Sequence, residues 1–81
     1  MKKRRFNIIY NKDKNIGMGE GYYIVFENYE GEPMLDSVYK TIEYNEQVDM
    51  VSVGILNKIN YMYDLGWVLD KYYTPNIKDL L

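Results

Sequence analysis

Residues 48–69, VDMVSVGILNKINYMYDLGWVL, decide the fold. Apolar residues recur there at every third or fourth position from Val48 to Met62, which is the spacing of one face of an α-helix. Gly66 follows this pattern, and glycine commonly ends a helix because it tolerates a positive φ. We therefore predict an amphipathic helix over residues 48–65 and, beyond Gly66, a turn into a last strand.

Four segments around this helix have the composition of β-strands. The clearest is GYYIVFEN, residues 21–28, which is rich in β-branched and aromatic residues. The predicted strands are 4–10, 21–28, 35–44 and 67–73, and a short tail with one helical turn follows over 76–81. The order β-β-β-α-β predicts one α+β domain over residues 1–81, with a small, mainly antiparallel sheet and one main helix on one face. The other face then has to be polar or find a partner.

Alternation along the strands predicts the core. Tyr22, Ile24 and Phe26 share one face of the second strand, and Tyr23 and Val25 share the other with Glu27. Because a carboxylate prefers water, we assign the first set to the core. The predicted core consists of Phe6, Ile8, Ile24, Phe26, Val51, Ile55, Ile59, Met62, Trp67 and Leu69.

The composition excludes several classes of function. The 81 residues include no Cys and no His, which removes thiol nucleophiles, thiolate metal sites and the commonest general base. Without these groups we expect no catalysis and no cofactor. The acidic residues show no EF-hand spacing, so we also expect no metal site. The basic start lacks the apolar run of a secretion signal, and no segment is long and apolar enough to span a membrane. A cytoplasmic location is therefore expected. Abundant Lys, Asn, Tyr and Ile with no Ala suggest an AT-rich genome, such as that of a phage or a low-GC bacterium.

Charge is unevenly placed along the chain. Lys and Arg dominate residues 1–14, whereas the remainder is acidic and brings the net charge to −2. Acids interleaved with an aromatic residue complement a basic groove on a larger protein. The candidate partner-binding residues are Glu27, Tyr29, Glu30, Glu32 and Asp36. They predict a small protein-binding inhibitor of a host protein, such as a defence or nucleic-acid-processing protein; an ordinary solvated surface is the alternative.

A second hypothesis is a homo-oligomer that sequesters a nucleotide-like ligand. A chain this short often gains stability by self-association. In this hypothesis basic residues near the start would hold phosphate and tyrosines would stack on the base; the candidates are Lys3, Arg4, Arg5, Tyr22 and Tyr23. Nucleic acid is an unlikely partner because the acidic body would repel it. A structural subunit of a larger assembly is a third possibility.

The glycines of residues 17–21, GMGEG, resemble a phosphate-binding loop. Such a loop needs a preceding strand and a following helix, whereas here a strand follows. We therefore predict a hairpin loop.

The helix-to-strand corner carries one family resemblance. Leu56-Asn57 and Gly66-Trp67-Val68-Leu69 resemble the corner of small bacterial and phage domains of unknown function, which reads Leu-Asn, then Leu-Gly, then Gly-Trp-Glu-Leu. Val68 stands where that family has Glu, and the segment between the two motifs is longer here. The resemblance implies that Trp67 packs back onto the helix, and it brings no catalytic residues. By type alone, the chain also resembles small phage proteins that antagonise host defence.

Overall fold

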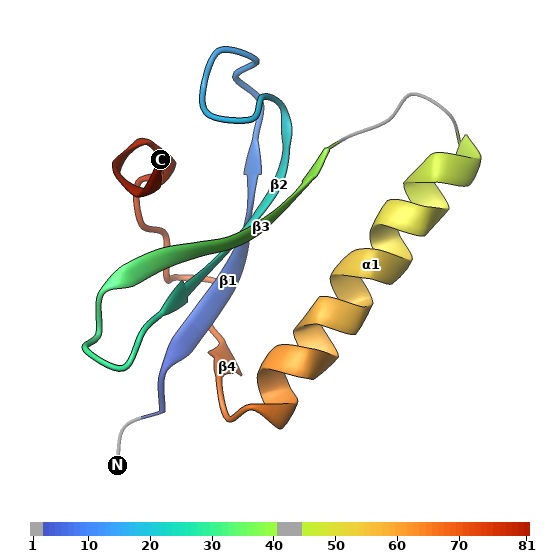
Figure 1. Ribbon diagram of the computed structural model, residues 1–81. Coiled ribbons are helices and arrows are strands. Elements are labelled where there is room, and N and C mark those ends of the chain that lie inside the picture. The colour runs from blue at the N-terminus through green and yellow to red at the C-terminus, as the bar shows by residue number, and fades with distance from the viewer. Residues whose placement is uncertain (1–2, 41–44) are drawn as a thin grey trace.

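The computed structural model describes residues 3–40 and 45–81, with side chains for residues 3–39 and 53–81. It confirms a small α+β fold with a mostly antiparallel sheet and one main helix (Figure 1). The elements are β1 (Arg5–Asn11), β2 (Gly21–Glu27), β3 (Pro33–Lys40), α1 (Asn45–Asp64), β4 (Val68–Leu69) and the short 3₁₀ helix η1 (Ile77–Leu80).

The sheet has the strand order β3-β2-β1-β4. The central strand β2 pairs antiparallel with both β1 and β3, and Phe26 lies opposite Phe6. β3 contains a bulge at Asp36. Ile24 of β2 pairs with Ser37, and the next residue of β2, Val25, pairs with Leu35, so Asp36 is the extra residue of β3. β4 joins β1 in parallel over only two residues. This alignment places Phe6 and Phe26 on the face toward α1.

Helix α1 covers one face of the sheet and ends as predicted. Gly66 has a φ of 98°. Its N–H donates to the carbonyl of Tyr63 (3.0 Å), and the N–H of Trp67 donates to the carbonyl of Met62 (3.0 Å). These two bonds form a Schellman motif, which satisfies carbonyls that the helix end would otherwise leave open. The helix begins at Asn45, three residues earlier than the predicted start.

The core between α1 and the sheet is built on aromatic rings. Phe6, Met62 and Trp67 are buried, and Phe26 and Ile59 pack against them. The ring of Phe26 meets Trp67 edge-on at a centroid distance of 6.0 Å, an arrangement that aromatic pairs favour. Trp67 therefore joins the helix to the sheet, as the sequence predicts.

The opposite face of the sheet is covered by the C-terminal segment of the same chain. This segment and α1 lie on opposite sides of the sheet (Figure 1). Tyr23 and Val25, which the alternation assigns away from the core, are completely buried. The Asn7 side chain donates 2.9 Å to the carbonyl of Tyr73, a residue that is itself buried. The prediction that only one face is core is therefore wrong, because the tail supplies a second apolar layer.

Two other expectations need correction. Leu69 is 41% exposed rather than part of the core, because β4 is a two-residue edge strand. The predicted strand through Tyr73 is also wrong: the chain turns at Asp70, whose carbonyl accepts from the N–H of Tyr73 at 3.1 Å. Of the remaining predicted core residues, Ile24 is fully buried, and Ile8 and Ile55 are half-buried. Residues 41–44 of the predicted third strand and the side chain of Val51 lie outside the described part.

Among the described residues, no helix combines the length and the apolar content needed to cross a lipid bilayer.

Candidate functional site

The turn between β2 and β3 has a fixed shape. The side-chain oxygen of Asn28 accepts from the N–H groups of Glu30 and Glu32, both at 2.9 Å. The N–H of Asn28 donates to the carbonyl of Glu32 at 2.9 Å, and Gly31 adopts a φ of 81°. Asparagine is favoured in turns because its side chain can replace a backbone acceptor. Three predicted partner-binding residues, Tyr29, Glu30 and Glu32, therefore lie exposed on one ordered turn, here called the hairpin tip (residues 28–32).

Tyr29 is 82% exposed, yet its ring is held in place. The guanidinium carbon of Arg4 lies 4.1 Å from the centroid of the Tyr29 ring and 4.5 Å from that of Trp67. The Arg4 Nε atom is buried and makes no hydrogen bond within the described part of the chain. Cation–π contacts at such sites contribute roughly 0.5–1 kcal/mol each. This supporting role of Arg4 is not evident from residue composition, although strand alternation places Arg4 on the same face as Phe6.

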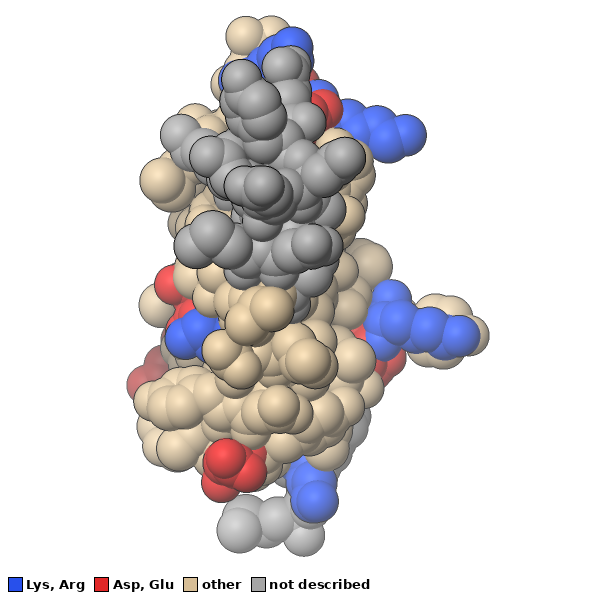
Figure 2. All heavy atoms as spheres, turned by 90° about the vertical axis from the view of Figure 1, so that its right-hand side faces the viewer, with Lys and Arg blue, Asp and Glu red and all other residues tan. Residues whose placement is uncertain are grey.

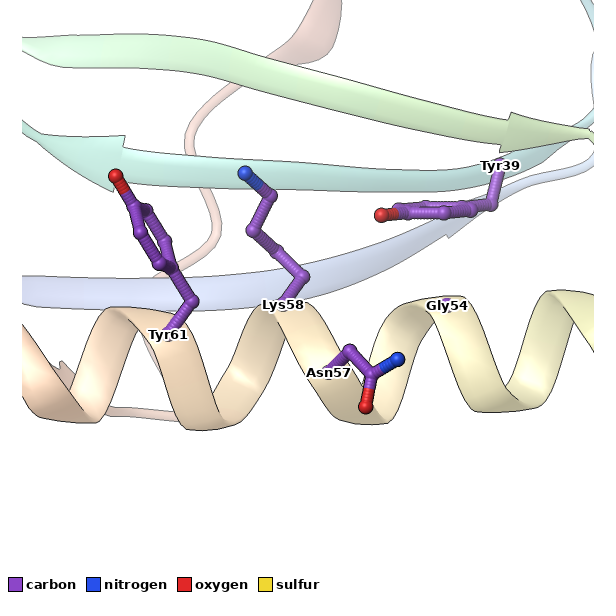
Figure 3. Close-up of a pocket in the computed structure, with 5 residues that line it drawn as sticks. All are labelled: Tyr39, Gly54, Asn57, Lys58 and Tyr61. Atoms are coloured by element: carbon purple, nitrogen blue, oxygen red, sulfur yellow. The ribbon is translucent and has the colours of Figure 1, made fainter.

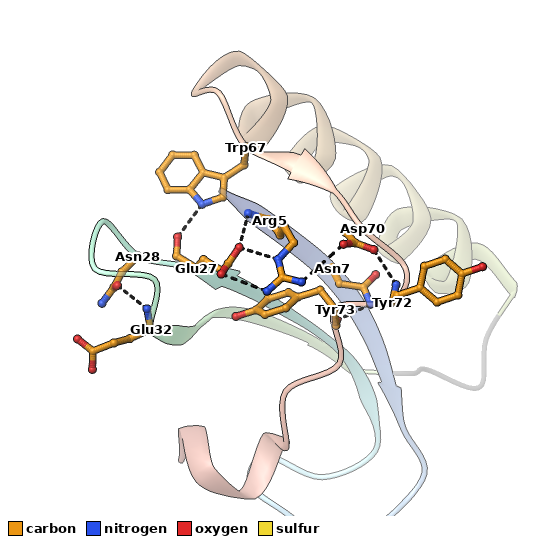
Figure 4. A network of polar contacts seen from close by, with 9 residues as sticks. All are labelled: Arg5, Asn7, Glu27, Asn28, Glu32, Trp67, Asp70, Tyr72 and Tyr73. Atoms are coloured by element: carbon orange, nitrogen blue, oxygen red, sulfur yellow. Dashed lines mark hydrogen bonds and ion pairs between the residues drawn. The ribbon is translucent and has the colours of Figure 1, made fainter. Parts of the chain in front are cut away.

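Glu27, another predicted partner-binding residue, is engaged within the fold (Figure 4). Its Oε1 accepts from the backbone N–H of Arg5 at 2.9 Å and from the Arg5 Nε at 2.8 Å. Its backbone carbonyl accepts from the indole N–H of Trp67 at 2.8 Å. The hydrogen bond with Glu27 raises the pKa of Arg5 above its ordinary value. Glu27 thus holds the base of the hairpin tip.

Asp36 is also paired, on the side of the sheet toward α1. Its carboxylate lies 2.9 Å from the Nζ of Lys58. The hydrogen bond with Asp36 raises the pKa of Lys58 above its ordinary 10.5. The structure therefore separates the predicted acidic set: Glu27 and Asp36 are matched by cations of this chain, and Glu30 and Glu32 remain beside Tyr29.

A shallow hollow of about 350 Å³ lies between β3 and α1 (Figure 3). Its lining residues are Tyr39, Gly54, Asn57, Lys58 and Tyr61. The Tyr39 ring lies over Gly54, where a Cβ would meet the ring at 2.9 Å. The Lys58 ammonium points toward the strands, where Asp36 already neutralises it. The hollow therefore offers no free charge with which to hold an ionic ligand.

The five candidates for nucleotide binding are not brought together. Arg5 packs over the ring of Tyr73 at 4.6 Å, on the face away from α1. Tyr22 lies near the other end of the sheet, beside Tyr10, with ring centroids 5.0 Å apart. Lys3 is exposed, Arg4 stacks on Tyr29, and Tyr23 is buried. Within the described part of one chain, these five residues therefore form no common site.

The glycine-rich loop is closed by Tyr23. The Tyr23 hydroxyl accepts from the N–H of Met18 at 3.0 Å and donates to the carbonyl of Gly19 at 2.7 Å. The Leu81 side chain lies against Gly17 so closely that a Cβ at this position would clash with it. The loop is therefore packed against the C-terminal segment.

The Tyr73 hydroxyl yields a first prediction. This oxygen is buried without a hydrogen-bond partner among the described residues. Burial, assisted by the charge of Glu27, raises the pKa of Tyr73 above its ordinary 10.0. Removing an unsatisfied hydroxyl costs little, so Tyr73→Phe should be neutral or stabilising by up to about 1 kcal/mol at neutral pH.

The same variant should alter the alkaline limb of the stability profile. Above pH 10.0 the unfolded chain loses the Tyr73 proton while the folded chain keeps it, so the stability of the wild type falls as pH rises. Lys58, whose pKa is also raised, adds a loss of the same sign above 10.5. Urea unfolding at neutral pH and above pH 10.0 measures this effect: the free energy of unfolding should fall less with rising pH for Tyr73→Phe than for the wild type. An equal fall in the free energy of unfolding for the wild type and Tyr73→Phe over this pH range would contradict this prediction.

The chain matches no protein-family model, no curated protein and no solved structure. Among the side chains of residues 3–39 and 53–81, no three acidic groups gather closely enough to hold a metal ion. The hairpin tip is therefore the strongest candidate site that the described side chains present.

Proposed function

We propose that this chain is a small, non-catalytic protein-binding module whose contact surface is centred on the hairpin tip. The observation that carries the proposal is Tyr29, which is 82% exposed while its ring rests on Arg4. Tyrosine is enriched among the residues that dominate binding energies, because it offers a large, rigid and amphipathic contact area.

The order of the tip supports the same function. A partner would not have to immobilise the turn, because Asn28 already holds the N–H groups of Glu30 and Glu32. Such preorganisation reduces the entropic cost of association. Glu30 and Glu32 are exposed on the same turn as Tyr29, and no ion pair engages them within the described part of the chain. They favour a partner with a basic surface and would speed the encounter with it.

The partner in this proposal is a larger host protein with a basic groove, such as a defence or nucleic-acid-processing protein. By inserting Tyr29 and presenting acids to the groove walls, the chain would exclude the natural polyanionic ligand and so act as an inhibitor. A phage-encoded chain would do this in the host cytoplasm. A structural rather than inhibitory partner would use the same surface.

The proposal is tested by substitutions at the tip. The tagged chain is used to capture its partner from host lysate, and the purified partner is then titrated with each variant. Tyr29→Ala should weaken binding at least about tenfold, as expected for a central aromatic contact. Tyr72→Ala is the matched control, because Tyr72 is 81% exposed on a different segment.

Charge reversal provides an independent test. Glu30→Lys combined with Glu32→Lys should weaken binding and make the remaining affinity less sensitive to salt. Full affinity in both the Tyr29 variant and the charge-reversed variant would refute the proposal. Purification of an oligomer with a bound UV-absorbing ligand would instead support nucleotide sequestration.

A further inference from the structure

Arg4 differs from Arg5 and Lys58 because no carboxylate of the described residues pairs with it. Arg5 lies 2.8 Å from Glu27, and Lys58 lies 2.9 Å from Asp36. Arg4 takes part in no ion pair within the described part of the chain, and its Nε atom is buried without an acceptor. Such a cation has lost water that nothing in the fold replaces, so an anion bound beside it would offset the cost of its burial.

Two aromatic rings hold the guanidinium of Arg4 in one orientation. Its central carbon lies 4.1 Å from the ring centroid of Tyr29 and 4.5 Å from that of Trp67, and the two rings stand at 65° to each other. Stacking on rings uses the flat faces of a guanidinium and leaves the donors along its edge. Nε is buried, but the two terminal amino groups are not among the buried atoms that lack a partner, so this edge is open to solvent.

A planar fork of donors fits a carboxylate. Two N–H groups of one guanidinium can donate in parallel to the two oxygens of a carboxylate, which is a strong and directional form of ion pair. Because the rings already fix Arg4, little side-chain freedom is lost when the acceptor arrives. The geometry points to Arg4 as the receptor for a carboxylate of the protein partner, bound beside Tyr29. This inference rests on the proposed function and adds an acidic residue to the partner's basic groove.

The surroundings of Arg4 favour a single carboxylate over a phosphate-bearing polyanion. Glu30 and Glu32 are exposed on the same turn as Tyr29, and the chain has a net charge of −2. Figure 2, in which α1 faces the viewer, shows Lys and Arg side chains at separate places around the margin of the molecule rather than in one basic patch. Polyanions are bound through several phosphate contacts at once, whereas a carboxylate needs only one fork.

The hairpin tip and Arg4 together then present both signs of charge to a partner. A basic groove with one acidic residue beside the site of Tyr29 would match Glu30, Glu32 and Arg4. A groove that is basic throughout would place a cation against Arg4, and such like-charge contacts suppress wrong partners. Arg4 would therefore select among basic grooves that the acidic residues alone would not distinguish.

The receptor role can be tested on the isolated chain with benzoate as the probe. Benzamide, which has a similar shape and no charge, is the control, and sodium benzoate replaces sodium chloride at constant ionic strength. Heteronuclear NMR follows the Nε–H of Arg4, whose burial protects it from exchange with water. This signal should shift and saturate with a dissociation constant on the order of 10–100 mM, as for one charge-assisted pair. The Nε–H of Arg5, which donates to Glu27, is the internal control and should shift less.

Arg4→Lys separates the fork from the charge, because lysine keeps the charge and loses the paired donors. Trp67 is the only tryptophan of the chain and lies against the guanidinium, so its indole N–H is a second reporter. Benzoate should shift this signal at least about threefold less in Arg4→Lys than in the wild type. A shift that does not saturate, an equal effect of benzamide, an equal shift at Arg5 or an unchanged response of Arg4→Lys would overturn the inference.

Titration of the purified partner separates a failure of this inference from a failure of the proposed function. Arg4→Lys should weaken binding about tenfold. Lys3→Ala is the control at the neighbouring exposed residue and should change the affinity less than about twofold. Full affinity of Arg4→Lys together with weak binding of Tyr29→Ala would overturn the carboxylate site and leave the proposed function standing. Full affinity of Tyr29→Ala and of the charge-reversed variant would refute the proposed function, and with it the partner's carboxylate, even where benzoate binds.

Discussion

Replacing Trp67 with alanine is expected to lower the free energy of unfolding by about 3–5 kcal/mol, the usual cost of emptying a large aromatic site in a core. A chain of 81 residues has a total stability of only roughly 4–12 kcal/mol. The substitution should therefore remove between about a quarter and all of the stability of the chain, and at the lower end of that range the variant would be largely unfolded at room temperature. Urea titration followed by far-ultraviolet circular dichroism measures the change.

The expected effect is large because Trp67 makes several contacts at one junction. Its ring is 8% exposed and packs with Phe6 and Met62. Its indole N–H donates to the carbonyl of Glu27 at 2.8 Å, and its π-face meets the guanidinium of Arg4. Alanine would leave a cavity, and it would remove the hydrogen-bond donor to the Glu27 carbonyl and the ring on which the Arg4 guanidinium stacks. The helix, the central strand and the hairpin tip would lose their shared contact.

Trp67→Phe separates packing from the hydrogen bond. Phenylalanine keeps an aromatic ring in the core but cannot donate to Glu27, so it should cost about 1–3 kcal/mol, less than alanine. Leu65→Ala is a suitable control, because Leu65 is half-exposed two residues earlier and should cost under about 1 kcal/mol. If Trp67→Ala were as stable as Leu65→Ala, Trp67 would not be the link between helix and sheet.

Local signals made the helix and its end predictable from sequence. Apolar spacing and Gly66 act within one or two turns of chain, and the Schellman bonds to Met62 and Tyr63 form there. The alternation along β2 likewise predicts that Ile24 and Phe26 face α1. These interactions join residues that are close in sequence or aligned by a hairpin.

The apolar layer on the opposite face of the sheet, under the C-terminal segment, could not be predicted in the same way. Its cover is an irregular segment in which Asn7 bonds to the carbonyl of Tyr73 across 66 positions of sequence. An irregular segment has no hydrophobic period from which packing can be inferred. The uninterrupted run YYIVF in β2 was the available signal, because strands buried on both faces are apolar at every position.

The candidate site, like the fold, could be predicted from the sequence only in part. Turn-forming residues such as Asn28 and Gly31 predict where the hairpin tip lies, and the structure places Tyr29 there. Which acids stay unpaired depends on distant residues. Glu27 meets Arg5 through the register of β1 against β2, and Asp36 meets Lys58 through the packing of α1. Sequence composition assigns all of these acids to one surface because it carries no information about such pairings.

Tyr23→Phe is expected to destabilise the protein by about 2 kcal/mol through the loss of one oxygen atom. The ring itself is fully buried and phenylalanine retains its packing. The hydroxyl, however, accepts from the N–H of Met18 and donates to the carbonyl of Gly19. Both backbone groups belong to the loop between β1 and β2, and both would lose a buried partner. A backbone group left unsatisfied costs about 1–3 kcal/mol, and access of water to the loop keeps the total near the middle of that range.

The consequence should extend from the loop to the C-terminal segment. Leu81 packs against Gly17. A loop that moves more freely would therefore also weaken the packing of the C-terminal segment on the sheet. Amide hydrogen exchange should therefore accelerate at Met18 and in η1, while α1 keeps its protection relative to global unfolding. Tyr22→Phe is the matched control on the neighbouring residue, because its hydroxyl makes no hydrogen bond within the described part of the chain. Equal stability and equal exchange in the two variants would show that the Tyr23 hydroxyl does not close the loop.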